Sequence, residues 1–247
     1  MISDDDRLAA DLAAEAGRRL LALRAAGGAA DELRRAGDRS SHEFLAAELA
    51  RQRPGDAVLS EEGADDLARL SADRVWIVDP LDGTREFGER GRTDWAVHVA
   101  LWERGELTAG AVALPAQDKV LSTADPVKPP ASPPAGTLRL LVSRTRPPEF
   151  MTRLARKLDA ELVPMGSAGA KAAAVICGDA EAYVHSGGQY EWDSAAPVAV
   201  AVASGLHASR IDGSKLSYNQ AKPSLPDILI CQAALADPLL EAISSVR

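Results

Sequence analysis

The chain has 247 residues, 46% of them hydrophobic and 26% charged, which is typical of a soluble globular protein with one large or two small domains. Its formal net charge of −8 argues against non-specific binding to nucleic acid or to a membrane surface. The acidic N-terminus lacks the features of a signal peptide or a membrane span, and Cys177 and Cys231 lack metal-type spacing. We therefore expect a cytoplasmic protein whose two cysteines are reduced and buried.

The first half of the chain is predicted to alternate helices with short strands. Apolar residues at helical spacing predict a helix over 4–26, closed by Gly27-Gly28, and a second helix over 39–52 with Asp38 as its N-cap. The elements expected after it are a strand at 57–59, a helical turn at 65–72, a strand at 75–78, a β-hairpin of 95–102 and 107–114, and a strand at 118–123.

The segment DPVKPPASPPAG, residues 125–136, is predicted to be a stiff loop because five of its twelve residues are proline. It is the expected boundary between an N-terminal α+β subdomain, 1–124, and a C-terminal α/β subdomain, 137–247. The elements expected in the second part are strands at 138–142 and 180–184, helices at 148–159, 169–177 and 194–204, a hairpin-like stretch, and a helix at 237–245. This mixture favours α+β layering over a regular parallel βαβ sheet.

Two acids, Asp79 and Asp82, follow a buried strand. Pro80 and Gly83 make a continuing helix unfavourable, so we expect a turn that brings both carboxylates to one side. Carboxylates and a free carbonyl such as that of Leu81 suit a hard cation like Mg²⁺. The alternatives are an Asx-type turn with solvated acids and, less well matched in spacing, the D-x-D-x-T motif of aspartyl-phosphate phosphatases.

Acids also stand at two other junctions between apolar segments. Glu61 and Glu62 follow the short strand at 57–59, and Asp193 precedes an apolar helix. Each has an ordinary explanation by itself, a polar helix start for the glutamates and an N-cap for Asp193. Together with Asp79 and Asp82 they suggest one fold that directs all of these acids into one pocket.

The order of these motifs resembles the inositol monophosphatase / fructose-1,6-bisphosphatase superfamily of Mg²⁺-dependent, lithium-sensitive phosphatases. The motifs are Ser60-Glu61-Glu62, Asp79-Pro80-Leu81-Asp82-Gly83-Thr84 and Trp192-Asp193-Ser194-Ala195-Ala196, and the resemblance spans about residues 5–220. Other stretches are most similar to the CysQ-type 3′-phosphoadenosine 5′-phosphate (PAP) phosphatases, namely Arg85-Glu86-Phe87, Val142-Ser143-Arg144, Gly166-Ser167-Ala168 with Lys171, and Glu191 before Trp192-Asp193. Ser186 stands where inositol phosphatases place a glutamate, which weakens the inositol interpretation.

The resemblance implies an αβαβα layered sandwich, a possible homodimer, and a role for each matching residue. The implied metal ligands, for two or three Mg²⁺ ions, are Glu61, Asp79, the Leu81 carbonyl, Asp82 and Asp193. The implied catalytic pair is Asp38 with Thr84. The implied substrate contacts are Gly83, Thr84, Arg144, Gly166, Ser167, Lys171 and Asp193. The stretch before Asp38 lacks the family's Thr-x-x-Asp pattern and loop lysine, for which Arg34 or Arg35 could substitute.

We therefore expect an enzyme that hydrolyses the 3′-phosphate of PAP, giving AMP in sulfur assimilation, by means of a metal-activated water. Broader activity on fructose 1,6-bisphosphate or inositol 1-phosphate is the first alternative. A non-catalytic nucleotide or metal sensor is the second, and the intact set of acids argues against it. We interpret His98, His185 and His207 as structural residues.

Overall fold

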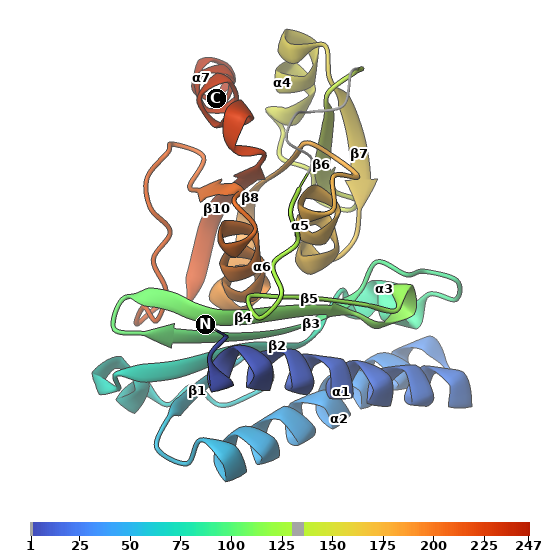
Figure 1. Cartoon of the computed structure of the whole chain (residues 1–247). Helices are drawn as coiled ribbons and strands as arrows, with labels where there is room; N and C mark the ends of the chain where they lie inside the picture. The colour runs from blue at the N-terminus through green and yellow to red at the C-terminus, as the bar shows by residue number, and fades with distance from the viewer. Residues whose placement is uncertain (1, 130–135) are drawn as a thin grey trace.

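Helices and sheets alternate in five layers (Figure 1). The computed structural model describes residues 2–129 and 136–247. Helices α1 (Asp4–Ala26) and α2 (Ala30–Gln52) form the first layer, covering one face of the first sheet. Helices α5 (Ala168–Ile176) and α6 (Glu191–Ala203) lie between the two sheets. The expected αβαβα sandwich is confirmed.

The first sheet has the strand order β1-β2-β3-β4-β5. Its strands are β1 (Ala57–Ser60), β2 (Arg74–Asp82), β3 (Ala96–Glu103), β4 (Glu106–Leu114) and β5 (Lys119–Ser122). β1 and β2 are parallel, and the remaining pairs are antiparallel, with the predicted hairpin at β3–β4. The C-terminal ends of the parallel strands β1 and β2 therefore lie side by side. There Ser60, the last residue of β1, pairs with Val78, the residue before Asp79.

The second sheet has the order β7-β6-β8-β10-β9 and mixes parallel with antiparallel pairs. Its strands are β6 (Arg139–Ser143), β7 (Glu161–Met165), β8 (Ala182–Tyr190), β9 (His207–Ser209) and β10 (Ser224–Cys231). Helices α4 (Met151–Leu158) and α7 (Ala236–Val246) complete the outer layer. The first sheet precedes the proline-rich segment and the second follows it, but the division into two subdomains stays a prediction. Residues 130–135 of the expected loop lie outside the described residues.

Helix α2 begins at Ala30, so the predicted start at 39 with Asp38 as N-cap is wrong. Asp38 lies in the middle of a 23-residue helix. Gly37, which would favour a helix end, instead lets the helix approach its neighbours, because a Cβ there would come within 2.8 Å of Leu81 Cδ2 and Phe87 Cε1. This close packing keeps α2 helical through Gly37 and carries Asp38 to the strand that bears Asp79 and Asp82.

Strand β2 is longer than predicted and does not end before Asp79. It continues to Asp82, and its pairing with β3 shifts register between Asp79 and Asp82. The register shift, a β-bulge rather than a terminal turn, brings two acids three residues apart to one side of the strand. A short helix, α3 (Thr84–Gly88), then begins after Gly83, which has the left-handed φ of 84°.

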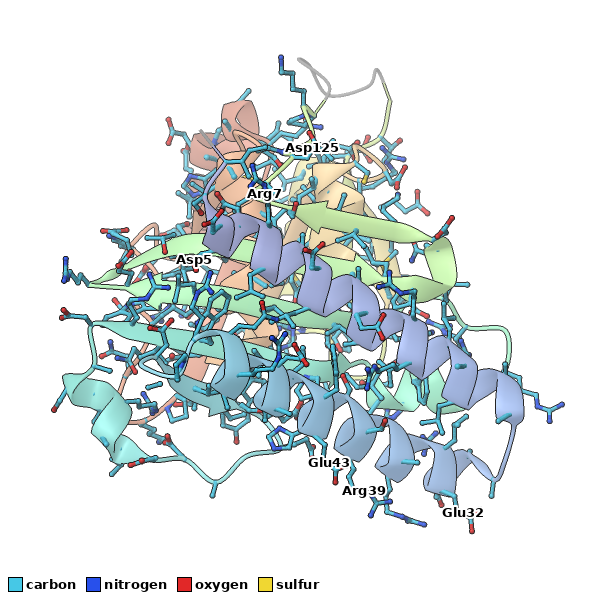
Figure 2. The ribbon with its side chains drawn as sticks, turned by 60° about the horizontal axis from the view of Figure 1, so that its bottom comes forward. Asp5, Arg7, Glu32, Arg39, Glu43 and Asp125 are labelled. Atoms are coloured by element: carbon cyan, nitrogen blue, oxygen red, sulfur yellow. The ribbon has the colours of Figure 1, made fainter. Side chains whose placement is uncertain are left out.

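We predict that Gly37→Ala destabilises the protein, although alanine is worth about 1 kcal/mol more than glycine inside a helix. The added methyl group must displace Leu81 and Phe87, so we expect a loss of about 1–3 kcal/mol in the free energy of unfolding, measured by urea titration. The matched control is Arg39→Ala on the same helix. Figure 2 shows Arg39, with Glu32 and Glu43, pointing away from the body of the protein, and a change within about 0.5 kcal/mol is expected there. Stabilisation by Gly37→Ala would contradict the packing argument.

Candidate active site

Three buried or partly buried carboxylates from two structural elements meet at one point. Asp79 and Asp82 come from β2 and Asp193 from the first turn of α6, and one carboxylate oxygen of each lies within 4.8 Å of the others. Asp79 is 1% exposed and Asp82 is 7% exposed, which excludes solvated acids, although Asp79 Oδ1 does accept the Asx-type hydrogen bond from the Leu81 N–H at 3.0 Å. Asp193 is the third residue of α6 rather than its N-cap, and its Oδ2 accepts a hydrogen bond from the Tyr190 N–H at 2.6 Å.

Asp82 is held in one orientation by donors to a single oxygen. Its Oδ2 accepts hydrogen bonds from Ser167 Oγ at 2.5 Å and from the Gly169 N–H at 2.7 Å, and His98 Nε2 lies 3.2 Å away. Burial opposes ionisation, but the hydrogen bond and charge of His98 outweigh it and lower the pKa of Asp82 to about 2. Asp82 is therefore an anion whose second oxygen, Oδ1, remains free of these bonds.

The other acids are harder to ionise because they repel one another. Burial, followed by the charges of Glu61 and Asp82, raises the pKa of Asp79 well above its usual value. Desolvation and the charge of Asp193 raise the pKa of Glu61 to about 7, although Glu61 is not one of the three clustered acids. Burial and the charge of Asp82 raise the pKa of Asp193 to about 6. A cation at this point would relieve the repulsion.

Asp38 and Thr84 are in contact, as the sequence comparison implied. Thr84 Oγ1 lies 3.2 Å from Asp38 Oδ1 and 3.0 Å from the Leu81 carbonyl oxygen. Burial and the charge of Glu62 raise the pKa of Asp38 to about 6. The catalytic roles of the pair stay predictions, but a carboxylate that is ionised at neutral pH and touches a hydroxyl can orient water and accept its proton.

A pocket opens beside the acids, between α3, the end of β6, the start of α5 and β8. Of the predicted substrate contacts, Gly83, Thr84, Arg144, Gly166, Ser167, Lys171 and Asp193 all line it. The Lys171 ammonium is buried and donates to the carbonyls of Met165, Gly166 and Ser167. Burial lowers the pKa of Lys171 to about 8, so the side chain is still mostly protonated at neutral pH. The role of each contact stays a prediction.

Arg144 reaches the pocket wall with its charge already paired. Its Nη2 contacts Glu86 Oε1 at 2.5 Å and Glu89 Oε1 at 3.0 Å, and its Nε also donates to Glu86. Glu86 is 5% exposed, and a Cβ on Gly166 would meet its carboxyl carbon at 2.4 Å. The Arg144–Glu86 pair thus packs directly behind the Gly166 backbone.

His98 is the site residue that the sequence did not reveal. It is fully buried in β3, and its Nδ1 lies 3.0 Å from the Trp192 carbonyl oxygen while its Nε2 faces Asp82. It therefore connects the strand that bears Asp82 with the start of the helix that bears Asp193. A single histidine in an apolar strand carries no signal of this in the sequence, and interpreting it as merely structural missed its place beside the acids.

Comparison with known proteins decides the family. The family model described as "Inositol monophosphatase family" matches residues 7–245. The chain belongs to the inositol monophosphatase family. The 3′-phosphoadenosine 5′-phosphate phosphatase of Mycobacterium tuberculosis is 56% identical, over 93% of this chain and 90% of that protein. The protein of the same name from Mycobacterium leprae is 52% identical, over 98% and 94%.

Solved structures of this family share the fold. The crystal structure of CysQ from Bacteroides thetaiotaomicron matches with a TM-score of 0.75 at 27% identity, covering 91% of this chain and 96% of that one. The resemblance predicted from the motifs is thus confirmed. The family places the chain among phosphatases. Within residues 2–129 and 136–247, no helix has both the length and the apolar character needed to cross a bilayer.

We predict that the metal-free protein loses stability as pH rises from about 4.5 to 7. The folded-state pKa of Glu61 lies above its usual 4.5, so its contribution is present below that value and is lost as pH rises through about 7. Asp38 and Asp193 act in the same direction up to about pH 6. Thermal unfolding in EDTA between pH 5 and 8 measures this.

Added Mg²⁺ should reverse the trend, because its ligands must be deprotonated. At roughly 100 times its Kd we expect the ion to raise Tm by about 5–10 °C at pH 8 and by less at pH 5.5. Asp212→Asn, which removes an exposed charge in the loop after β9, is the comparison and should leave the Mg²⁺ shift unchanged. An equal Mg²⁺ shift at both pH values would contradict the assignment of raised pKa values to the ligands.

We also predict that His98→Gln weakens Mg²⁺ binding about 10–100-fold, the usual effect of losing a group that orients a metal-ligating carboxylate. The amide keeps one donor but cannot reach both Asp82 and the Trp192 carbonyl. Isothermal titration with Mg²⁺ gives the Kd, and His207→Gln, which alters a histidine paired with Ser209, serves as the control. Unchanged affinity in His98→Gln would show that Ser167 and Gly169 alone orient Asp82.

Proposed function

We propose that this phosphatase removes the 3′-phosphate of PAP to give AMP, acting as a Mg²⁺-dependent 3′(2′),5′-bisphosphate nucleotidase. The observation that carries the proposal is a cluster of buried carboxylates opening onto a pocket with three arginines, Arg85, Arg144 and Arg146, in its wall. An acidic metal site would bind the phosphate that is hydrolysed, and an arginine-lined wall suits a substrate that bears a second phosphate. The 56% and 52% identical relatives named PAP phosphatases support the choice of substrate.

The donor set fits Mg²⁺. All candidate ligand atoms are oxygens, from the carboxylates of Glu61, Asp79, Asp82 and Asp193 and the carbonyl of Leu81, and such hard donors match this ion. Among the described residues Asp79 Oδ2 is buried without a hydrogen-bond partner, a cost that a bound cation would remove. When bound, Mg²⁺ would neutralise the phosphate ester and lower the pKa of water.

The chain's own residues would supply proton transfer and orientation. Asp38, largely ionised at neutral pH, would accept the proton of the attacking water at Oδ1, and Thr84 Oγ1 would fix the direction of that water. The Asp38 side chain keeps its position because α2 is continuous there and Ser41 Oγ donates to the Pro80 carbonyl at 2.7 Å. Water is thus held between a helix and the bulged strand.

Backbone N–H groups would stabilise charge on the transferred phosphate. Those of Gly83 and Thr84 follow the metal strand directly, and the left-handed φ of Gly83 turns the chain there. Ala195 is the fifth residue of α6, so its N–H lies beyond the four leading N–H groups that lack a helical partner and is not expected to contribute. The Gly83 and Thr84 groups are fixed before substrate arrives, which is the condition for effective transition-state stabilisation.

Ser186 bears on the alternative substrates. It lies on β8 at the position where inositol phosphatases carry a glutamate, and serine has no carboxylate that could accept hydrogen bonds from sugar hydroxyls. The chain is therefore expected to prefer a nucleotide over inositol 1-phosphate or fructose 1,6-bisphosphate. Removal of PAP would place the enzyme in sulfur assimilation. Lithium sensitivity and the homodimer stay predictions.

The test is phosphate release from PAP, inositol 1-phosphate and fructose 1,6-bisphosphate with Mg²⁺ and with EDTA. We expect PAP to be preferred by at least tenfold, with the rate abolished by EDTA. Asp82→Asn should reduce kcat about 10³-fold or more because it removes a charge from the metal site, while Asp212→Asn, an exposed acid in a distant loop, should leave kcat unchanged. Equal rates on all three substrates would overturn the nucleotide specificity, and no Mg²⁺-dependent release would leave the sensor alternative.

A further inference from the structure

We propose that Arg146, rather than Arg144, binds the second phosphate of the substrate, the one that is not hydrolysed. This inference rests on the proposed function and assigns one residue of the pocket wall to one group of the bisphosphate. It follows from the charge state and contacts of the cations that line the pocket.

The pocket cations differ in how much charge they can offer. Arg144 is engaged by Glu86 and Glu89, and the buried Lys171 ammonium already donates to three backbone carbonyls. Arg85 and Arg146 have guanidinium groups with no hydrogen bond or ion pair to any residue within 2–129 and 136–247. An anion entering the pocket can therefore use Arg85 or Arg146 without breaking an existing ion pair.

Position distinguishes the two free arginines. Arg85 directly follows Thr84 on α3, beside the predicted site of the scissile phosphate. Arg146 follows β6, and its side chain lies against β8, since a Cβ on Gly188 would come 3.2 Å from Arg146 Nη1. Arg146 also lines the adjoining surface hollow formed with Pro147, Pro148 and Ser186. Arg146 thus belongs to both the pocket and the adjoining hollow, and we assign it to the phosphate on the far side of the sugar.

The backbone around Arg146 is fixed rather than free. The Arg146 N–H donates to Ser143 Oγ at 3.1 Å, which closes a short turn directly after β6. Gly188 has a left-handed φ of 69°, which favours glycine, and because glycine has no Cβ the guanidinium can lie against the facing chain. An arginine whose backbone is fixed and whose guanidinium group is unpaired is well suited to hold a phosphate by two parallel hydrogen bonds.

The neighbouring His185 does not compete for the phosphate. Its Nε2 donates to the Gly187 carbonyl at 2.8 Å, which leaves Nδ1 as an acceptor that is buried without a partner among the described residues. Burial lowers the pKa of His185 to about 4, so the ring is neutral. A neutral acceptor repels a phosphate oxygen and suits a hydroxyl or amino donor instead. Phosphate binding at this end of the pocket therefore depends on Arg146.

The test compares Arg146→Ala with the unchanged protein on PAP and on adenosine 3′-monophosphate, which lacks the second phosphate. We expect kcat/KM for PAP to fall about 10–100-fold, as for loss of hydrogen bonds to a charged group, and kcat/KM for the monophosphate to stay within about twofold. Arg146→Lys should recover part of the loss. Arg153→Ala, which removes an exposed arginine of α4, is the matched control and should change neither substrate.

Binding of AMP and of adenosine, by titration with Mg²⁺ present, gives a readout that does not require turnover. The unchanged protein should bind AMP at least tenfold more tightly than adenosine, and Arg146→Ala should remove most of this difference. A selective loss with Arg85→Ala instead, or an equal loss on both phosphate esters with Arg146→Ala, would overturn the assignment. If the unchanged protein does not hydrolyse PAP, the proposed function itself is wrong. That result is obtained before any variant is compared, so the two failures can be told apart.

Discussion

The mutual repulsion of carboxylates in a buried place is the constraint on which the rest of this structure depends. Asp79, Asp82 and Asp193 bring their oxygens within 4.8 Å in a part of the protein where water screens charge poorly. The fold reduces the repulsion in two ways. It stabilises the Asp82 anion with hydrogen bonds from Ser167 and Gly169 and with the His98 ring 3.2 Å away, and burial with the neighbouring charges raises the pKa of Asp79, which favours its uncharged form.

The layered architecture supplies the rigidity that such a site needs. Strand β2 is covered by α2 on one face and by α6 on the other, so the acids of β2 and α6 approach through a packed core instead of through mobile loops. Small residues make the approach possible. A Cβ on Gly110 of β4 would come 2.7 Å from Ala199 of α6, and one on Gly169 of α5 would come 2.1 Å from His98 Nε2. The small side chains of these elements therefore let the helices pack closely against the sheet, which brings the acidic side chains together.

Sequence reasoning identified the acids because their chemistry is local. Asp79, Leu81, Asp82 and Thr84 lie within six residues, and the order of the motifs along the chain led to Asp193, which joins the three-acid cluster. Glu61, predicted with it, lies outside that cluster, and its role as a ligand stays a prediction. Sequence reasoning failed where the deciding contact joins distant segments. Gly37 was expected to stay outside a helix, but Leu81 and Phe87 pack against it and α2 begins at Ala30. The strand β7 was not predicted because Pro164 weakens the pattern, yet a proline is tolerated on this edge strand.

The roles of the arginines, which matter for substrate specificity, also depend on contacts between distant segments. A sequence shows that Arg144 and Arg146 both follow a strand near the site, but it cannot show which guanidinium is already paired. Glu86 and Glu89 come from a segment more than fifty residues away, and their contacts convert Arg144 from a phosphate ligand into a support for the Gly166 backbone. Although the chain has a net charge of −8, Arg85 and Arg146 in this pocket have no acidic partner among the described residues. At Arg146 the missing partner is best supplied by the substrate. The two phosphates of a nucleotide bisphosphate would then be recognised by different means, one through the cation bound by the acids and the other through an arginine that the protein leaves free.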